Sequence, residues 1–459
     1  MSSTFSGITS ALGGMQAARR GLEVAGQNIA NARTEGYSRQ RVETAAVGGT
    51  ANAAFYATPP ATAGSVEVTG VTRMADAFLE ARGRTEHSKQ AYLDGREEIL
   101  STTEGLFDEP SDNGLQAQLT GMWKSWTDTA DNPGDSAVRN QLVVSSGVVA
   151  DRLNNLAQTL GGEYTDTRGR LDSTLSEINT GARRLADLNT AVVQAKQHGL
   201  PANELLDQRD QLALRLVELT GGTTSTGADG SLDVQLGGVS LVSGSTARSL
   251  TLTGSATLTG AAGDPATVRW SDDASAAPLT GGSGGALLEG LTTIMPDYLA
   301  QLDQVASKLA TGVNQLHRAG FTPTGAAGGD FFSGTTAATI KVALTGGDQV
   351  ATSSSATRAL DGSNADAISA LARSATGPDA AYRQTVVKIG MAVQTAASRS
   401  ATQASITAQV DAARQSSAGV NLDEELTSML TYQRSYEAAA RVMSAVDSML
   451  DTLINRTGR

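Results

Sequence analysis

A seven-residue repeat near the N-terminus is the feature that most constrains how this chain folds. Between Ser6 and Gln40, apolar residues recur at spacings of three and four, which is the pattern of a helix with a packing seam. The large seam residues are Ile8, Met15, Leu22 and Ile29, and the small residues that alternate with them are Ala11, Ala18 and Ala25. The sequence therefore predicts a long helix that packs against a partner.

Three glycines follow the same repeat beside this seam. Gly7, Gly14 and Gly21 stand seven residues apart, so one line along the helix has no side chains and another backbone could approach it closely. Glycine inside a helix costs about 1 kcal/mol relative to alanine, or about 5 kcal/mol for the five glycines between Gly7 and Gly26. We expect this helix to depend on packing, and we predict that both terminal segments are disordered in the monomer and become helical on assembly.

A second and more regular repeat occupies the C-terminus. From Asn421 onward, apolar residues again alternate at spacings of three and four, and Glu425 is the one polar residue among them. The positions of this repeat are Leu422, Met429, Tyr432, Tyr436, Ala439, Met443, Val446, Leu450 and Leu453. Asn421 suits the N-cap of a helix, and the acidic residues that follow it suit the first turn. We expect the N- and C-terminal helices to pair as a coiled coil.

Between the repeats, the sequence predicts long helices with one insertion. An extended stretch with a short strand at 66–68 follows the first repeat, and helical spacing then continues to Leu219. From Gly221 to about Gly285 the chain is rich in Gly, Thr and Ser, with short alternating runs typical of β-hairpins. The predicted fold class is mainly α with an inserted small β domain. The predicted domains are a terminal coiled coil (1–45 and 415–459), a long helical bundle as the middle or core domain (46–220 and 286–414) and the β insert (221–285).

Composition excludes several functions. The chain has 35 Lys and Arg against 47 Asp and Glu, a net charge of −12, and no run of basic residues, so we expect no nucleic-acid partner. It has no cysteine, which removes disulfides, thiolate chemistry and cysteine-based metal sites. It has neither a signal-peptide pattern nor an apolar run of 18 residues, and we expect no membrane insertion. These signals alone predict a soluble cytoplasmic protein.

Few residues suggest chemistry. The three histidines, His87, His198 and His317, are isolated in sequence, so we expect surface or helix-end positions rather than metal ligation. Glu424 and Glu425 are interpreted as solvated charges that compensate the helix dipole. The GGSGG run at 281–285 lacks the Lys-Ser/Thr ending of a phosphate-binding loop and is interpreted as a linker. We expect no catalytic residue, no metal and no cofactor.

Two amides near the end of the first predicted helix have two interpretations. Asn28 and Asn31 can cap that helix locally, or they can bond to the backbone of a neighbouring segment. Gly36 permits a positive φ where the chain leaves the helix.

The two ends of the chain carry a resemblance. The run NIANARTEGYSRQ resembles the N-terminal signature shared by bacterial flagellar rod, hook and hook-associated axial proteins, and GVNLDEELTSMLTYQRSYEAAARVMSAVDSMLDTLI resembles their C-terminal signature. The GYSRQ ending, with FDEPSDNGL, ADNPGDSAVRN and LHRAGFTPTGAAGGDFF in the interior, is similar to the hook-associated branch of this family. The β insert carries little recognisable signal, and the outer domains of the family are expected to be reduced here.

The resemblance implies a structural subunit that joins hook to filament and assembles helically around the export channel, with its terminal helices innermost. The implied partners are further copies of the chain, the hook protein, the second junction protein (hook-associated protein 3) and an export chaperone on the C-terminal segment. The implied location is extracellular, in the flagellum, after export without a cleaved signal peptide, which replaces the cytoplasmic expectation. The predicted self-assembly interface comprises Gly7, Ile8, Gly14, Met15, Gly21, Leu22, Asn28, Ile29, Asn31, Gly36, Tyr37, Leu422, Met429, Tyr432, Tyr436, Met443, Val446, Leu450 and Leu453.

Three alternatives remain open at the level of sequence. A hook or distal rod axial protein shares the terminal signatures. A secreted adhesin or another coiled-coil assembly protein would have the heptads without the paired signatures. A cell-wall hydrolase associated with the axial structure would need a convergent pair of acids in a cleft.

Overall fold

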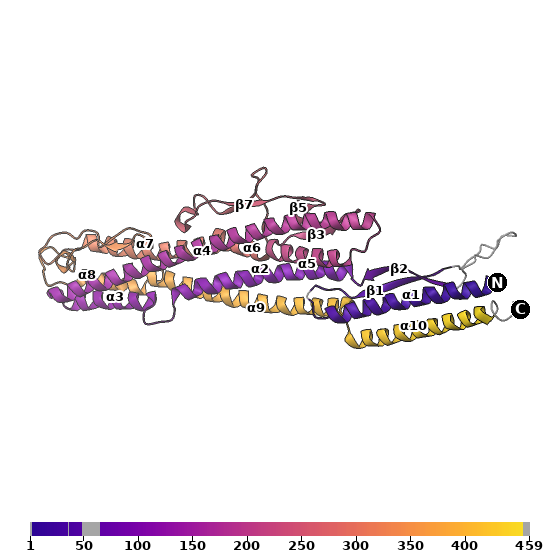
Figure 1. The fold of residues 1–459 in the computed structure, drawn as a ribbon. Helices are drawn as coiled ribbons and strands as arrows, with labels where there is room; N and C mark the ends of the chain where they lie inside the picture. The colour runs from indigo at the N-terminus through magenta and orange to yellow at the C-terminus, as the bar shows by residue number, and fades with distance from the viewer. Residues whose placement is uncertain (1, 35, 48–64, 453–459) are drawn as a thin grey trace.

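The helix α4 (Ser136–Gln197), 62 residues long, runs along the middle of an elongated and mainly helical molecule (Figure 1). The structure is a computed structural model that describes residues 2–34, 36–47 and 65–452. The other helices are α1 (Ser2–Asn31), α2 (Ala77–Phe107), α3 (Leu115–Asp131), α5 (Asn203–Thr220), α6 (Gly282–Glu289), α7 (Met295–Ala319), α8 (Ser363–Ser369), α9 (Pro378–Ala418) and α10 (Leu422–Asp451). The strands are β1 (Gln40–Val47), β2 (Ser65–Arg73), β3 (Thr223–Thr226), β4 (Leu232–Leu236), β5 (Val239–Ser243), β6 (Thr246–Ala247), β7 (Leu250–Thr253), β8 (Thr267–Trp270), β9 (Phe332–Ser333) and β10 (Lys341–Val342).

The two ends of the chain lie together, where α1 and α10 run side by side in opposite directions (Figure 1). The predicted pairing of the terminal helices is confirmed. Asn421 caps α10 as expected, because its side-chain oxygen accepts hydrogen bonds from the backbone N–H groups of Asp423, at 3.0 Å, and Glu424, at 3.4 Å. Leu453, the last residue of the predicted seam, lies outside the described residues.

A β-hairpin packs on α1. Strands β1 and β2 pair in antiparallel register, with an irregularity between Glu43 and Thr44. The sequence predicts only the short strand at 66–68 here, and β1 is a finding of the structure. Because the hairpin lies against α1, we propose that the terminal unit extends to Arg73 rather than ending at residue 45.

The predicted helical core forms one long bundle, in which α2 lies along α9 and α3 lies along α4 (Figure 1). Apolar residues at spacings of three and four line the buried side of α4 along its whole length, as the periodicity predicts. Trp123 and Trp126 of α3 are buried, and the ring centroid of Trp126 lies 5.0 Å from that of Phe331. The helix α4 begins at an aspartate cap, Asp135, and ends before Gly199.

The inserted β segment lies along α4. Strands β3 to β6 form one antiparallel sheet in sequence order, and β7 pairs with β8. Two asparagines of α4 hold the insert by its backbone: Asn179 exchanges two hydrogen bonds with Leu250, and Asn189 exchanges two with Leu232. The insert is thereby fixed to the bundle by amide groups that mimic a neighbouring strand.

The interpretation of residues 281–285 as a linker is wrong. This run forms the beginning of α6, which packs against α2 and α5, and Gly282, Gly284 and Gly285 are buried. Gly282 has a φ of +63°, and an added side-chain carbon there would lie 2.5 Å from the carbonyl oxygen of Glu218. The glycines are therefore needed because backbones approach closely at this point, not because the segment is flexible.

Candidate assembly interface

The glycine line of α1 faces α10. A side-chain carbon added at Gly7 would lie 3.8 Å from Cγ2 of Val446, and one added at Gly14 would lie 3.7 Å from Cβ of Ala439. From the first contact to the second, the position moves seven residues forward along α1 and seven residues back along α10. The terminal pair is therefore an antiparallel heptad pair in which α1 provides space and α10 provides side chains.

Gly21 continues this series. A side-chain carbon added there would overlap the ring of Tyr432 at 2.5 Å, and Tyr432 stands seven residues before Ala439. The atoms that lie closest to these glycines thus belong to side chains of α10 and not to its backbone. The close approach of another backbone occurs beside the line, at Gly13, where an added carbon would lie 2.5 Å from the carbonyl oxygen of Val66 in β2.

The next layer of the pair is polar. Asn28 is buried, and its amide nitrogen donates to the carbonyl oxygen of Gln40, at 2.9 Å, and to Oε2 of Glu425, at 3.1 Å. Its amide oxygen accepts from the backbone N–H of Gln40, at 3.0 Å, and from the hydroxyl of Tyr37, at 2.8 Å. Of the two interpretations of this residue, bonding to neighbouring segments is confirmed, because Asn28 joins α1, β1 and α10 at one point.

Glu425 is the polar residue within the C-terminal repeat, and it stands seven residues before Tyr432. Its side chain is only 4% exposed and forms an ion pair with Arg39, with Nε–Oε1 at 2.7 Å. Arg39 also binds the more exposed Glu424, with Nη1–Oε2 at 2.8 Å. The interpretation of Glu425 as a solvated charge is therefore wrong, whereas the exposed Glu424 fits that interpretation in part.

The turn after α1 supports this layer. Asn31 caps locally, since its amide donates to the carbonyl oxygen of Gln27 at 3.0 Å and accepts from the hydroxyl of Thr34 at 3.2 Å. Gly36 has a φ of +76°, as its position predicts. Burial, followed by the negative charges of nearby carboxylates, raises the pKa of Tyr37 to about 12, so its hydroxyl stays protonated and donates to Asn28.

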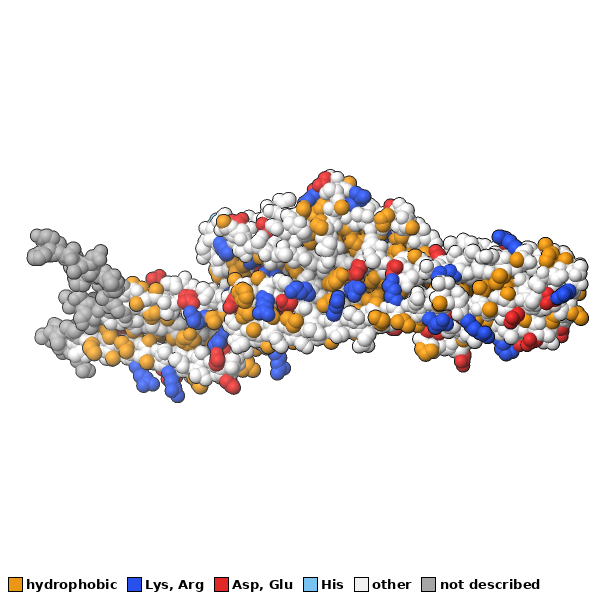
Figure 2. Space-filling model, turned by 180° about the vertical axis from the view of Figure 1, so that it is seen from behind, with side chains coloured by type: hydrophobic (Ala, Val, Ile, Leu, Met, Phe, Trp, Pro, Cys, Tyr) orange, Lys and Arg blue, Asp and Glu red, His pale blue; other side chains and the backbone are white. Residues whose placement is uncertain are grey.

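The remaining seam residues divide into two groups. Val446 is buried, and the others in the pair are half-buried: Ile8, Met15, Leu22, Ile29, Met429, Tyr432, Met443 and Leu450. Two predicted seam residues, Leu422 and Tyr436, are exposed in the single chain, and a second apolar line on α10 is exposed beside them at Leu426 and Leu430. Figure 2 shows hydrophobic side chains gathered at this end of the molecule, next to the grey residues.

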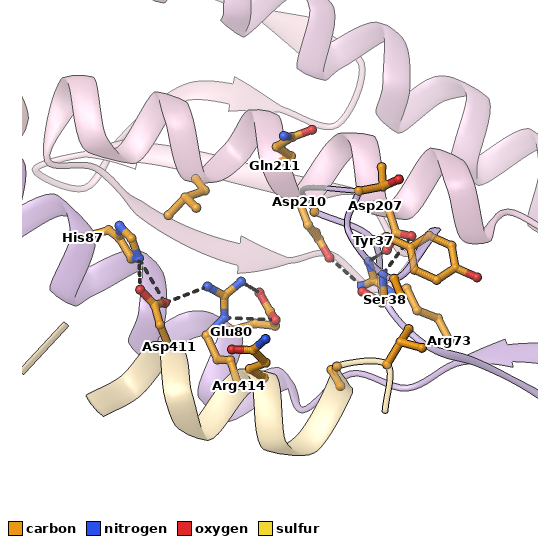
Figure 3. A pocket seen from close by; sticks show the side chains of 18 residues that line it. Tyr37, Ser38, Arg73, Glu80, His87, Asp207, Asp210, Gln211, Asp411 and Arg414 are labelled. Atoms are coloured by element: carbon orange, nitrogen blue, oxygen red, sulfur yellow. Dashed lines mark hydrogen bonds and ion pairs between the residues drawn. The ribbon is translucent and has the colours of Figure 1, made fainter. Parts of the chain in front are cut away.

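A polar cleft of about 410 Å³ lies where the terminal pair meets the helical core (Figure 3). At the root of the hairpin, Arg73 binds Asp207 at 2.8 Å and Asp210 at 2.5 Å, and both carboxylates belong to α5. The backbone N–H of Ser38 also donates to Asp207, at 3.3 Å. On the other wall, Arg414 of α9 binds Glu80 of α2. Ion pairs therefore connect the hairpin to α5 and the end of α9 to α2.

His87 lies in the same cleft between two carboxylates. Its Nδ1 lies 3.2 Å from Glu218 of α5 and its Nε2 lies 3.0 Å from Asp411 of α9. The hydrogen bond to Glu218, together with that to Asp411, raises the pKa of His87 above its ordinary value, although burial opposes this shift. The imidazole thus joins three helices, a role that the isolated position of His87 in the sequence does not reveal.

The other two histidines differ from each other. His198 follows the last residue of α4 and is exposed, as expected. His317 lies in the last turn of α7, which is one of the two kinds of position predicted for the histidines, but it is fully buried. Its Nδ1 lies 2.8 Å from the carbonyl oxygen of Gly329, and its Nε2 accepts from the backbone N–H of Ala351 at 2.9 Å. Burial lowers its pKa, and the neutral ring serves as a bridge between loops.

We call the cleft between the terminal pair and the helical core, with the ion pairs of Arg73, Arg414 and His87, the joint, and its charged groups bind one another. Within residues 2–34, 36–47 and 65–452, no group of three or more potential metal ligands is placed to hold an ion. In the same residues, no helix has the length and apolar character needed to cross a membrane. The arrangement is suited to holding helices in fixed positions.

Family models match three parts of the chain. Residues 100–332 match the model of the flagellar hook-associated protein FlgK helical domain. Residues 8–37 match the model of the flagella basal body rod protein, and residues 413–456 match that of the flagellar basal body rod FlgEFG protein C-terminal region.

Individual relatives span the whole chain. The flagellar hook-associated protein 1 of Bacillus subtilis (strain 168) is 29% identical, over 100% of this chain and 99% of the relative. The protein of the same name from Escherichia coli (strain K12) is 26% identical, over 98% and 99%. Among solved structures, the flagellar hook junction protein FlgK from Burkholderia pseudomallei has a similar fold, with a TM-score of 0.65 and 16% identity, over 73% of this chain and 100% of that one.

Proposed function

The chain belongs to the FlgK family of flagellar hook-associated proteins, which makes it a structural protein of the hook-filament junction, and we propose that its copies assemble there through the α1–α10 pair. The matches to rod proteins are confined to the two ends, whereas the hook-associated model covers the helical middle. The alternative of a hook or distal rod protein therefore has less support than a junction protein.

The observation that carries this proposal is the exposed apolar surface of α10. Among the described residues, fifteen large hydrophobic side chains are exposed, and six of them lie on this one helix. These six are Leu422, Leu426, Leu430, Tyr436, Val442 and Met449. Because α1 covers only one side of α10, a second copy packed against the open side would bury those of the six that face away from α1, such as Leu426 and Leu430, and gain their transfer free energy.

The finer features of the role are those that the resemblance to flagellar axial proteins implies. We propose a helical homo-oligomer around the export channel, with the hook protein and the second junction protein (hook-associated protein 3) as neighbours. An export chaperone would cover the apolar side of the C-terminal segment until the chain leaves the cell without a cleaved signal peptide. We propose no enzymatic activity, and therefore no cell-wall hydrolysis, because the carboxylates of the joint are engaged in ion pairs with arginine and histidine.

Replacing two exposed apolar residues of α10 tests this proposal. Leu426→Ser combined with Leu430→Ser removes apolar side chains that are 51% and 57% exposed and stand four residues apart. We expect binding of the purified chain to isolated hooks, measured by sedimentation, to fall by at least ~10-fold, since about 2 kcal/mol of burial is lost per leucine. Purified protein makes the result independent of export.

The chain offers a matched control on α9. Val387→Ser combined with Met391→Ser also replaces two exposed apolar residues four positions apart, but within the helical core. We expect this variant to bind hooks as the natural chain does. Equal binding by both double variants would mean that the open side of α10 is not the assembly surface.

A further inference from the structure

The α1–α10 pair has four successive layers, and only one of them is polar. Three layers join a glycine of α1 to a residue of α10, and the fourth joins Asn28 to Glu425. An added carbon at Gly7 or Gly14 would make ordinary contact with Val446 or Ala439, at 3.8 and 3.7 Å, whereas the Tyr432 ring already fills the space at Gly21. None of these three layers contains a charged group, so they provide contact area but little electrostatic discrimination between one apolar helix and another.

The polar layer, by contrast, requires a partner with matching charge and hydrogen-bonding groups. Glu425 is buried, and a buried carboxylate is tolerated only where charged and hydrogen-bonding partners replace water. Its two oxygens have separate partners: Oε1 accepts from Arg39 at 2.7 Å, and Oε2 accepts from Asn28 at 3.1 Å. Both partners are held in place beforehand, because Asn28 exchanges hydrogen bonds with Gln40, and the carbonyl of Arg39 accepts from the N–H of Met74.

We propose that Asn28 and Arg39 form a socket for one helix-borne carboxylate, and that insertion of Glu425 into this socket decides whether and in which register α10 docks on α1. Apart from Glu425, Val446 is the only residue of α10 that is buried in the described part of the helix. The apolar seam, which buries few residues of α10, thus adds contact once the Glu425 carboxylate is in the socket. A helix without an acid in this layer leaves the Arg39 guanidinium and the Asn28 amide partly unpaired, at a cost that the seam does not offset.

This inference deepens the proposed function, because it names the residues that build the surface through which copies would assemble. Its test is nevertheless independent of assembly, since docking of α10 is read within a single purified chain. Normal hook binding by the leucine variants would overturn the proposed function without changing the docking result, and a natural docking rate in the charge variants would overturn the inference without changing the hook-binding result.

The absence of cysteine allows a direct measurement of docking. Cysteines introduced as Gly14→Cys and Ala439→Cys would have their Cβ atoms about 3.7 Å apart, within the range that a disulfide requires. A second pair, Gly7→Cys with Ala439→Cys, reports a slide by one heptad, because seven helical residues span about 10 Å. We expect the first pair to form a disulfide rapidly in the full-length chain and the second to remain reduced.

Charge reversal in this background tests the socket. Arg39→Glu and Glu425→Lys should each slow formation of the 14–439 disulfide by at least ~10-fold, because each places like charges together in a buried layer. The double variant, Arg39→Glu with Glu425→Lys, restores opposite charges and should recover most of the rate. Glu437→Lys is the control, since it makes the same charge change on an exposed part of α10 and should leave the rate unaltered.

Two results would overturn the proposal. One is a natural rate of 14–439 disulfide formation in both single variants, which would mean that the apolar seam alone seats α10. The other is a double variant that is no faster than the single variants, which would mean that the two charges act separately rather than as partners. Appearance of the 7–439 disulfide in Glu425→Lys would support the role of this layer in setting the register.

Discussion

Asn28 and Asn31 have identical side chains and lie within one turn of the same helix, yet they differ in role. Asn31 bonds within its own turn, whereas Asn28 holds a strand and a second helix. The sequence predicts both roles for such residues without assigning either. The deciding fact is which side of α1 faces α10, and Asn28 continues the seven-residue line of Gly7, Gly14 and Gly21.

Glu425 was visible in the sequence as the one polar residue in an apolar repeat, but its partner was not. Arg39 lies 386 residues away and, although it stands inside the stretch from Ser6 to Gln40, it is not one of the seam positions. Periodicity identifies the face on which a residue lies, but it does not identify a charged group that a turn of another segment brings to that face. The three-helix bridge at His87 was hidden for the same reason.

The charge on His87 gives a prediction at this scale. Because the pKa of His87 is raised in the folded chain, its stabilising contribution is complete below the unfolded value of about 6.5 and is lost as the pH rises through the higher folded value. The groups that face His87 are Glu218 from α5 and Asp411 from α9, with Arg414 bound to Asp411. We expect His87→Gln to lower the thermal midpoint of unfolding at pH 6 and to have a smaller effect as the pH rises.

The difference in unfolding midpoint between the natural chain and His87→Gln, taken at each pH, removes the contribution of His317. Burial lowers the pKa of that residue, so its contribution is lost as the pH falls, and this occurs equally in both chains. A difference in midpoint that does not change with pH would contradict the proposed bridge.

At the scale of elements, the long helices can be predicted from the sequence, whereas the way in which the glycine-rich segments pack against them cannot. Apolar residues at helical spacing over many turns leave few alternatives for α2, α4 and α9. The glycine-rich beginning of α6 was misread because flexible linkers and tightly packed backbones use the same residue. Only the proximity of the Glu218 carbonyl to Gly282 distinguishes the two.

Two glycines of α1 provide a matched experiment on the terminal pair. Gly21→Ala and Gly26→Ala raise helix propensity equally, by about 1 kcal/mol. An added carbon at Gly26 meets nothing within 4 Å, whereas one at Gly21 overlaps the ring of Tyr432. We expect Gly26→Ala to slow hydrogen exchange in α10, measured by mass spectrometry, and Gly21→Ala to accelerate it. Slower exchange in both variants would mean that the ring moves aside without cost.

At the scale of the whole molecule, burial is lower in the terminal pair than in the helical core. Nineteen residues of α4 are buried, whereas two of the described residues of α10 are. Local stability follows buried contacts, so the molecule should open first at its terminal pair. The prediction that the termini are disordered in the monomer concerns this same property and stays a prediction.

Hydrogen exchange of the full-length natural chain measures this gradient. We expect amides of α10 to exchange at least ~100-fold faster than those in the middle of α4, and to become protected when the chain is bound to hooks. Uniform protection along the free chain would show that the terminal pair is as stable as the bundle.

The ion pairs at the joint also determine how a mechanical load passes through the molecule. Twisting of the terminal pair reaches the helical core through Arg73 on two aspartates and through Arg414 on Glu80, and these bonds have fixed directions. Apolar surfaces slide past one another with little change in free energy, whereas a guanidinium pulled from its carboxylates loses its bonds at once. We therefore expect the joint to act as a stiff coupling rather than a hinge, and because these side chains are only 11–26% exposed, salt should screen them little and torsional rigidity should change little as ionic strength rises.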